Sequence, residues 1–248
     1  GLRNNDGTVK PGYSETNNVI IKNSTILRAR RNGISFLDGR NIIIDNCIIS
    51  DTGQGKQVYD ASGNKIASSA GSAPMYGIDL EAIRSRSADG SLQRTALNED
   101  IIIKNSTFTG NAAGDIVVFT ANDVIIEQNN FDYAVRSFAS DNITIRGNIF
   151  KSREPQSLEA ISIRSFVHFD NEEDAQGEEL NHHWQVYDNT IKEYAKGVII
   201  AGQSHDVKNN IIENCIYGVF LIDNLTDSTF SNNNIISTIE GSSGYQNI

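Results

Sequence analysis

The chain is poor in proline, cysteine, methionine and tryptophan, with 3 Pro, 2 Cys, 1 Met and 1 Trp among its 248 residues. Two cysteines exclude a disulfide-rich scaffold. No apolar run approaches the roughly 20 residues that span a bilayer, so membrane insertion is not expected. The chain also lacks a basic excess, because 21 Lys and Arg face 31 Asp and Glu and leave a net charge of −10. This balance argues against a nucleic-acid partner, which requires a positive surface.

Isoleucine and asparagine are abundant instead, with 34 Ile and 28 Asn. β-Branched residues favour strands, and asparagine favours tight turns. Hydrophobic residues make up 38% of the chain, which is enough for a core. The composition therefore predicts an all-β protein and argues against a helical bundle.

An internal repeat sets the predicted architecture. Eight segments share a template of alternating Ile or Val, a polar pair and a final Ile or Phe. They read VIIKNSTI (from Val19), IIIDNCII (Ile42), IIIKNSTF (Ile101), VIIEQNNF (Val124), ITIRGNIF (Ile143), WQVYDNTI (Trp184), HDVKNNII (His205) and STFSNNNI (Ser228). Five of the seven separations lie between 19 and 23 residues, and the other two equal this period plus an insertion. A period of this kind indicates a solenoid.

The sixth position of the template predicts a polar ladder. It is occupied by Ser24, Cys47, Ser106, Asn129, Asn148, Asn189, Asn210 and Asn233. Stacked at about 4.8 Å, these side chains would bond up and down the stack. A second short strand follows most copies, reading GISFL (from Gly33), GIDLE (Gly77), DIVVF (Asp115), AVRSF (Ala134), AISIR (Ala160), GVIIA (Gly197) and GVFLI (Gly218).

A coil of about 21 residues with short strands and an asparagine ladder resembles the right-handed parallel β-helix superfamily, which is pectate-lyase-like. The resemblance covers roughly residues 17–240 and is closest in style to phage tailspike polysaccharide depolymerases. It implies an all-β fold, a right-handed parallel β-helix of about eight coils. A β-sandwich is the alternative, but sandwich strands do not repeat one consensus at one period.

The register predicts one domain over residues 1–248, which we expect to be the central part of a longer chain. Residues 51–75, 84–99 and 167–183 are expected to be insertions at coil corners, where loops commonly build sites. Cys47 and Cys215 lie about five coil rises apart, on the order of 24 Å. A disulfide needs Cα atoms within about 7 Å, so none is expected between them.

Alternation along the second strand gives each side chain a direction. The isoleucine and valine column from Ile34 to Val219 is expected to point inward. The position before it is almost always Gly or Ala, with Asp115 as the exception, and is expected to form the outward floor of a groove. Asp79 and Glu81, two residues apart, should point outward from one strand. Asp115 should lie one coil along, diagonally across from Asp79.

Three converging carboxylates predict a catalytic site made of Asp79, Glu81 and Asp115. Like charges side by side are destabilising without a cation, a shared proton or a basic partner. For either residue of the GIDLE strand alone, a solvated strand face is the alternative interpretation. The predicted substrate-binding residues surround this cluster. They are Tyr76, Arg136, Arg164, Phe119, Phe138, His182 and Trp184.

The first functional hypothesis is a glycoside hydrolase that acts on a bacterial surface polysaccharide or another complex polysaccharide. Two carboxylic acids are the usual catalysts of this reaction. The first alternative, implied by the resemblance, is a calcium-dependent lyase or a C5-epimerase-like enzyme acting on a uronic-acid polymer. In that case Asp79, Glu81 and Asp115 would hold Ca²⁺, for which carboxylates are suitable ligands. The second alternative is a non-catalytic glycan-binding module of a tail fibre or adhesin.

The expected partners follow from these hypotheses. A polysaccharide substrate is expected, and no cofactor is certain, although Ca²⁺ is an option. The resemblance to tailspikes implies a homotrimer and an extracellular or virion-surface location. The spacing of His182 and His183 does not match a helical zinc site.

Overall fold

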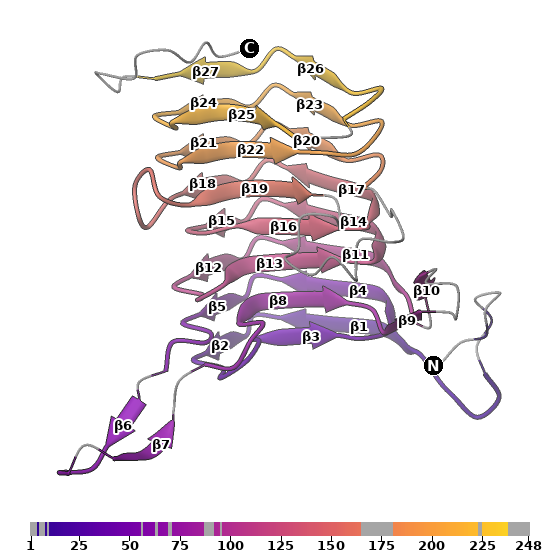
Figure 1. The fold of residues 1–248 in the computed structure, drawn as a ribbon. Coiled ribbons are helices and arrows are strands. Elements are labelled where there is room, and N and C mark those ends of the chain that lie inside the picture. The colour runs from indigo at the N-terminus through magenta and orange to yellow at the C-terminus, as the bar shows by residue number, and fades with distance from the viewer. Residues whose placement is uncertain are drawn as a thin grey trace.

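The protein is a parallel β-helix whose coils stack from the N-terminal to the C-terminal end (Figure 1). The computed structural model describes residues 4, 8, 10–55, 57–62, 64–68, 71–86, 92–94, 96–164, 181–222 and 225–237. These residues form strands, turns and bends and contain no helix. None of them therefore forms a helix long and apolar enough to cross a membrane.

Three parallel sheets form the walls of the solenoid. Sheet 1 has eight strands: β1 (Thr16–Lys22), β4 (Gly39–Asp45), β11 (Asn98–Lys104), β14 (Ala121–Glu127), β17 (Asp141–Arg146), β20 (Gln185–Tyr187), β23 (Asp206–Lys208) and β26 (Thr229–Ser231). Sheet 2 has eight: β2 (Thr25–Leu27), β5 (Ile48–Ser50), β12 (Thr107–Thr109), β15 (Asn130–Phe131), β18 (Ile149–Lys151), β21 (Thr190–Lys192), β24 (Ile211–Glu213) and β27 (Asn234–Ile236). Sheet 3 has seven: β3 (Ile34–Phe36), β8 (Tyr76–Glu81), β13 (Gly114–Phe119), β16 (Val135–Phe138), β19 (Glu159–Arg164), β22 (Lys196–Ile200) and β25 (Tyr217–Leu221).

Two antiparallel hairpins extend from the coils. β6 (Gln57–Tyr59) pairs with β7 (Lys65–Ser68), and β9 (Arg84–Arg86) pairs with β10 (Leu92–Arg94). Both lie within predicted insertions, and β6–β7 projects away from the stack (Figure 1). The second insertion ends two residues earlier than predicted, because β11 begins at Asn98. Most of the third, residues 167–180, lies outside the described residues.

The predicted repeat is confirmed by the register of sheet 1. Ile42 pairs with Val19 in the coil before and with Ile101 in the coil after, and Ile101 pairs with Val124. Ile42, Ile101 and Val124 are buried, and Val19 in the first coil is partly buried against the core. Inside sheet 2, Phe108, Phe131 and Phe150 stack with ring centroids 4.9 and 4.7 Å apart. Identical residues at one position thus form continuous columns in the core.

The asparagine ladder is confirmed. Its side chains bond one another and also bond the backbone of neighbouring coils. Asn148 Oδ1 accepts hydrogen bonds from the backbone N–H of Asn129 at 2.9 Å and from Asn129 Nδ2 at 3.2 Å. Asn148 Nδ2 donates to the carbonyl oxygen of Ile126 at 2.9 Å and to Asn189 Oδ1 at 3.0 Å. Each buried amide therefore joins three coils and satisfies backbone groups at the turn between sheets 1 and 2.

Turns with left-handed backbone account for nine further asparagines. The residue just before each ladder position has a positive φ in all eight coils, from Asn23 (51°) to Asn232 (55°). A second such residue bends or precedes each strand of sheet 1, from Asn18 (57°) to Asp227 (50°). Asn and Asp tolerate this conformation better than other side chains with a Cβ.

The column of small residues at the start of the sheet 3 strands points inward, which contradicts the predicted outward groove floor. A Cβ on Gly77 would lie 3.2 Å from Phe108 Cδ1, and one on Gly197 would lie 3.0 Å from Ile212 Cγ2. Phe108 and Ile212 are core residues of sheet 2. The strand turns at the corner between sheets 2 and 3, so two successive residues face the interior and only small side chains fit at the first.

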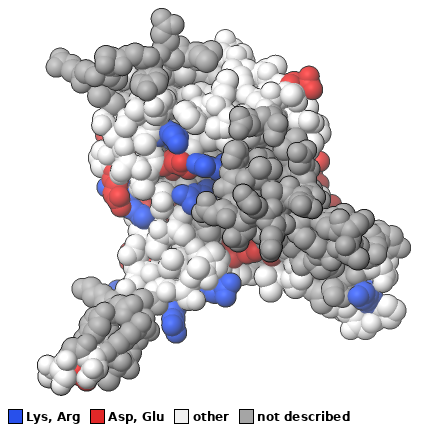
Figure 2. Space-filling model, in the orientation of Figure 1, with Lys and Arg blue, Asp and Glu red and all other residues white. Residues whose placement is uncertain are grey.

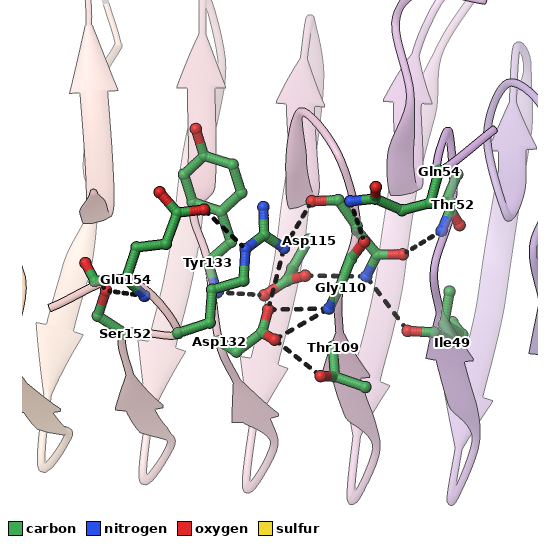
Figure 3. Close-up of polar contacts among 12 residues, drawn as sticks. Ile49, Thr52, Gln54, Thr109, Gly110, Asp115, Asp132, Tyr133, Ser152 and Glu154 are labelled. Carbon is green, nitrogen blue, oxygen red and sulfur yellow. Dashed lines mark hydrogen bonds and ion pairs between the residues drawn. The ribbon is translucent and has the colours of Figure 1, made fainter. Parts of the chain in front are cut away.

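Asp115 occupies this inward column and is fully buried, so its predicted place on the surface beside Asp79 is wrong. Its two carboxylate oxygens accept hydrogen bonds from Asn111 Nδ2 and from the backbone N–H of Tyr133, both at 2.9 Å (Figure 3). Asn111 also bonds the Ile49 carbonyl and the Thr52 backbone N–H. Asp115 therefore ties together the corners of adjacent coils.

We predict that Asn148→Ala lowers the free energy of unfolding by about 2–4 kcal/mol, because it leaves buried backbone and side-chain groups unsatisfied. Asn130→Ala is the matched control, since Asn130 is exposed on β15, and it should change stability by less than about 0.5 kcal/mol. Urea unfolding followed by circular dichroism measures both. Equal losses in the two variants would contradict the ladder's role.

Asp115 should make stability depend on pH. Burial raises the pKa of its carboxyl to about 7, although the Asn111 hydrogen bond lowers it. The folded chain then retains a proton that the unfolded chain releases near its ordinary pKa of about 3.9. The unfolding free energy of the protein should therefore fall relative to that of Asp115→Asn between about pH 4 and about pH 7 and level off above. Urea unfolding over this range measures the difference, and a difference that rises with pH would refute the assignment.

Candidate functional site

The outer face of sheet 3 carries most of the predicted site residues. Asp79 pairs with Val117, which pairs with Arg136, so these three form one outward column. Glu81, Phe119, Phe138 and Arg164 form the next column. Figure 2 views this face and shows basic side chains beside acidic ones near its centre. The register expected for these two columns is therefore confirmed.

A pocket of about 330 Å³ opens between β16 and β19 on this face. It is lined by Tyr133, Arg136, Phe138, Ser157, Leu158, Glu159 and Arg164. The sequence analysis missed Tyr133 and Glu159. Both lie one residue before the column of small side chains, at the position that Tyr76 and Lys196 also occupy. That position would have identified them as outward-facing.

Arg136 enters this pocket without a direct ion pair to a carboxylate of the described chain, although Glu159 lines the same pocket and interacts with it electrostatically. Its Nη1 and Nη2 lie 3.5 Å from the hydroxyl oxygens of Tyr76 and Tyr133, and its guanidinium carbon lies 5.5 Å from the centre of the Tyr133 ring. Its Nε is buried without a hydrogen-bond partner, and no carboxylate of the described chain forms an ion pair with it. Burial raises the pKa of the Tyr76 phenol, although Arg136 lowers it, so this neighbour stays neutral.

Arg164 differs from Arg136 because its charge is balanced. Its Nη2 lies 2.6 Å from Glu159 Oε1, and its Nε donates to Ser162 Oγ at 2.8 Å. Lys196 also approaches Glu159, with its Nζ 3.7 Å from the same oxygen. One carboxylate thus serves two cations here, which leaves this side of the pocket with a positive excess.

Asp79 and Glu81 share the outward direction of β8, as predicted. Asp79 is only 3% exposed, and its Oδ2 accepts a hydrogen bond from Asn32 Nδ2 at 2.6 Å. Two coils separate Asp79 from Arg136, a distance of about 9.6 Å along the solenoid axis. Glu81 is half-buried. These acids therefore lie beside the arginine pocket and outside its lining.

The predicted three-acid cluster does not form, because Asp115 is buried at the corner of the coil on the inner side of the sheet. A calcium site made of Asp79, Glu81 and Asp115 is excluded for the same reason. Among the described residues, no group of three or more His, Cys, Asp or Glu is arranged to hold a metal ion.

Three predicted substrate-binding residues are placed differently from expectation. Trp184 is fully buried in the core, because its position in the repeat is the inward one that Ile143 fills in the previous coil. Phe119 and Phe138 are 6% and 5% exposed and pack on each other with ring centroids 5.8 Å apart. Phe138 still forms part of the pocket wall, whereas Phe119 does not.

His182 lies at the turn that leads into sheet 1, in register with Asp141 and Gln203. It is absent from the lining of the sheet 3 pocket. His168 lies outside the described residues. Cys47 and Cys215 are both buried free thiols, which confirms that no disulfide joins them.

Comparisons with known proteins agree with this fold. Residues 3–85 match the family described as right handed beta helix region. Two Bacillus subtilis (strain 168) proteins are similar: YclG, 26% identical over 82% of this chain and 30% of its own length, and the SPbeta prophage-derived YorA, 22% identical over 86% and 31%. The chain thus spans under a third of each relative. No solved structure matches it.

This family match covers a third of the chain, and the fold also occurs in polysaccharide-degrading enzymes. The fold and the family comparison identify the protein as a right-handed parallel β-helix.

Proposed function

We propose that the outer face of sheet 3 binds an acidic polysaccharide and cleaves it beside Arg136. The observation that carries this proposal is that Arg136 forms no ion pair with a described carboxylate and has an unpartnered Nε in an open pocket. A guanidinium matches the planar geometry of a carboxylate and binds it through two hydrogen bonds. A sugar carboxylate can therefore take the place that no described Asp or Glu fills.

β-Elimination is the reaction that these residues support best. The proton on the carbon next to a uronic carboxylate becomes acidic only when the carboxylate charge is neutralised, which Arg136 can do. A base then removes this proton, the bond from the adjacent ring carbon to the glycosidic oxygen breaks, and the leaving oxygen takes up a proton. The Tyr133 phenol is our candidate for both transfers: its O–H proton passes to the leaving oxygen while its oxygen takes up the proton from carbon. Its hydroxyl lines the same pocket 3.5 Å from Arg136 Nη2.

Hydrolysis by Asp79 and Glu81 is the second candidate. It is favoured by their common outward direction on β8, which separates their Cα atoms by about 6.7 Å. Carboxyl groups about 6.5–9.5 Å apart suit an inverting hydrolase. The low exposure of Asp79 and its bond to Asn32 weigh against this candidate. A non-catalytic glycan-binding role remains the outcome if the chain binds polysaccharide and releases no product.

The expected location, oligomeric state and cofactor stay predictions. One relative is prophage-derived by name, which supports a phage-borne protein acting at a virion surface or outside the cell. A homotrimer is still proposed. Ca²⁺ also remains a proposal, without an assigned set of ligands in the described part of the chain.

Arg136→Gln should lower the initial rate of cleavage by at least about 10²-fold, because the substrate carboxylate loses its neutralising partner. The assay uses polygalacturonate, alginate, hyaluronan and chondroitin sulfate, with neutral dextran as the substrate control. Unsaturated uronate is followed by ultraviolet absorbance and total cleavage by new reducing ends. Arg146→Gln is the matched control, since Arg146 lies on sheet 1 and pairs with Glu127 at 2.6 Å. Unchanged cleavage by Arg136→Gln would refute the proposed site.

Tyr133→Phe and a pair of acid variants separate the two reactions. If elimination is correct, Tyr133→Phe lowers the rate by about 10²–10⁴-fold, and Asp79→Asn and Glu81→Gln lower it far less. If hydrolysis is correct, both acid variants lose at least about 10²-fold, and reducing ends form without ultraviolet absorbance. Thermal unfolding by circular dichroism checks that each variant folds.

A further inference from the structure

A second groove lies on the outer face of sheet 1, away from the sheet 3 pocket. It has a volume of about 720 Å³ and crosses five coils, from β1 to β17. It is lined by Asn18, Ile20, Asn41, Ile43, Asp100, Ile102, Asp123, Ile125, Asn142 and Thr144. Four steps of about 4.8 Å make it about 19 Å long along the solenoid axis. The reactions considered above do not use it.

The groove exists because the strands of sheet 1 bend at the same position in successive coils. Asn41, Asp100 and Asp123 occupy equivalent places in β4, β11 and β14, with φ of 54°, 55° and 53°. Asn18 and Asn142 have the same left-handed backbone in β1 and β17. Their side chains form a polar wall. Two residues further on, aliphatic side chains from Ile20 to Ile125 form the floor, and Ile20 is 63% exposed.

Two carboxylates face this groove at neighbouring coils. The register places Asp100 and Asp123 one coil apart, because Glu99 pairs with Asn122 and Ile101 pairs with Val124. Their equal φ angles orient the two side chains alike. Asp123 accepts a hydrogen bond from Asn142 Nδ2. Asp100 has no hydrogen-bond or ion-pair partner within the described part of the chain.

Among the described residues that line the groove there is no Lys or Arg to offset these charges. On sheet 1, Arg40 pairs with Glu99 and Arg146 with Glu127, each at 2.6 Å. Lys22 and Lys104 lie two residues beyond the isoleucine floor, at the ends of β1 and β11. Two like charges at one-coil spacing repel each other unless a cation lies between them. A ligand that brings positive charge to this wall would relieve that repulsion.

We propose that this groove binds an extended saccharide that carries free amino groups, of the glucosamine type. Its ammonium groups would bind Asp100 and Asp123, its hydroxyls would bond the amides of Asn41 and Asn142, and the C–H faces of its rings would lie on the isoleucine floor. The ligand is extended because the groove is long and its wall and floor repeat at each coil. A bare metal ion fits less well, because two carboxylates on an open wall supply too few ligands.

The test measures binding of two oligosaccharides of equal length, a β1,4-linked glucosamine hexamer and its fully N-acetylated counterpart, by calorimetry at low ionic strength. The glucosamine hexamer should bind at least about tenfold more tightly, because acetylation removes the positive charges. Ile methyl resonances in NMR spectra locate the site. Shifts should concentrate on Ile20, Ile43, Ile102 and Ile125 and spare core isoleucines such as Ile116.

The double variant Asp100→Asn and Asp123→Asn should weaken binding of the glucosamine hexamer at least about tenfold. It should fold normally, since Asn already occupies this left-handed position at Asn18, Asn41 and Asn142. The matched control is Asp188→Asn with Asp227→Asn. It removes two charges from exposed left-handed positions outside the groove and should leave binding unchanged.

Three results would each overturn the proposal. They are equal binding of the two hexamers, equal weakening by both double variants, and methyl shifts centred on sheet 3. Equal weakening would mean that the acidic protein attracts a polycation through its net charge alone. Shifts on sheet 3 would mean that the hexamer occupies the arginine pocket, so that result also separates this proposal from the function proposed for sheet 3.

Discussion

The structure depends on the phase of its coils, which buried amides hold at the turn between sheets 1 and 2. Each ladder asparagine accepts the backbone N–H of the coil before it and donates to a carbonyl of that region, so a slip by one residue would break several buried hydrogen bonds at once. Every surface feature follows from this phase. Columns on sheet 3 bring Arg136 and Arg164 to one pocket, and columns on sheet 1 bring Asp100 beside Asp123.

The contrast between Arg136 and Arg164 shows how the same residue type acquires different roles. Arg164 is held by Glu159 and Ser162 and has little charge left for a ligand. In the described part of the chain, Arg136 is contacted by two phenol groups at long distance and by the face of an aromatic ring, and it forms no ion pair with Glu159 on the same pocket wall. Orientation without neutralisation is what an anion-binding arginine requires.

Repetition made much of the fold predictable from the sequence. The template, the ladder and the outward columns of Asp79 and Glu81 all follow from a period of about 21 residues and from strand alternation. Alternation failed at the corner before each sheet 3 strand, where Gly77 and Asp115 both precede an inward residue and are inward themselves. Side chains alternate between the two faces of a sheet only along a strand. This alternation does not predict side-chain direction at the bend where the strand begins. Trp184 was misassigned for a related reason, since its own place in the repeat already marked it as a core residue.

The hairpin β6–β7 leaves and re-enters the coil at a corner without disturbing the stack. Ile34 pairs with Ile78 as neighbours in sheet 3, although 44 residues separate them in the chain. The ends of the corner insertion bond the coil, for example Gly53 N–H to the Ala29 carbonyl and Ser72 N–H to the Arg30 carbonyl, while the pairing of sheet 3 continues across it. Such segments can be exchanged between β-helices as cassettes, so that recognition can diversify quickly while the scaffold that presents it stays constant.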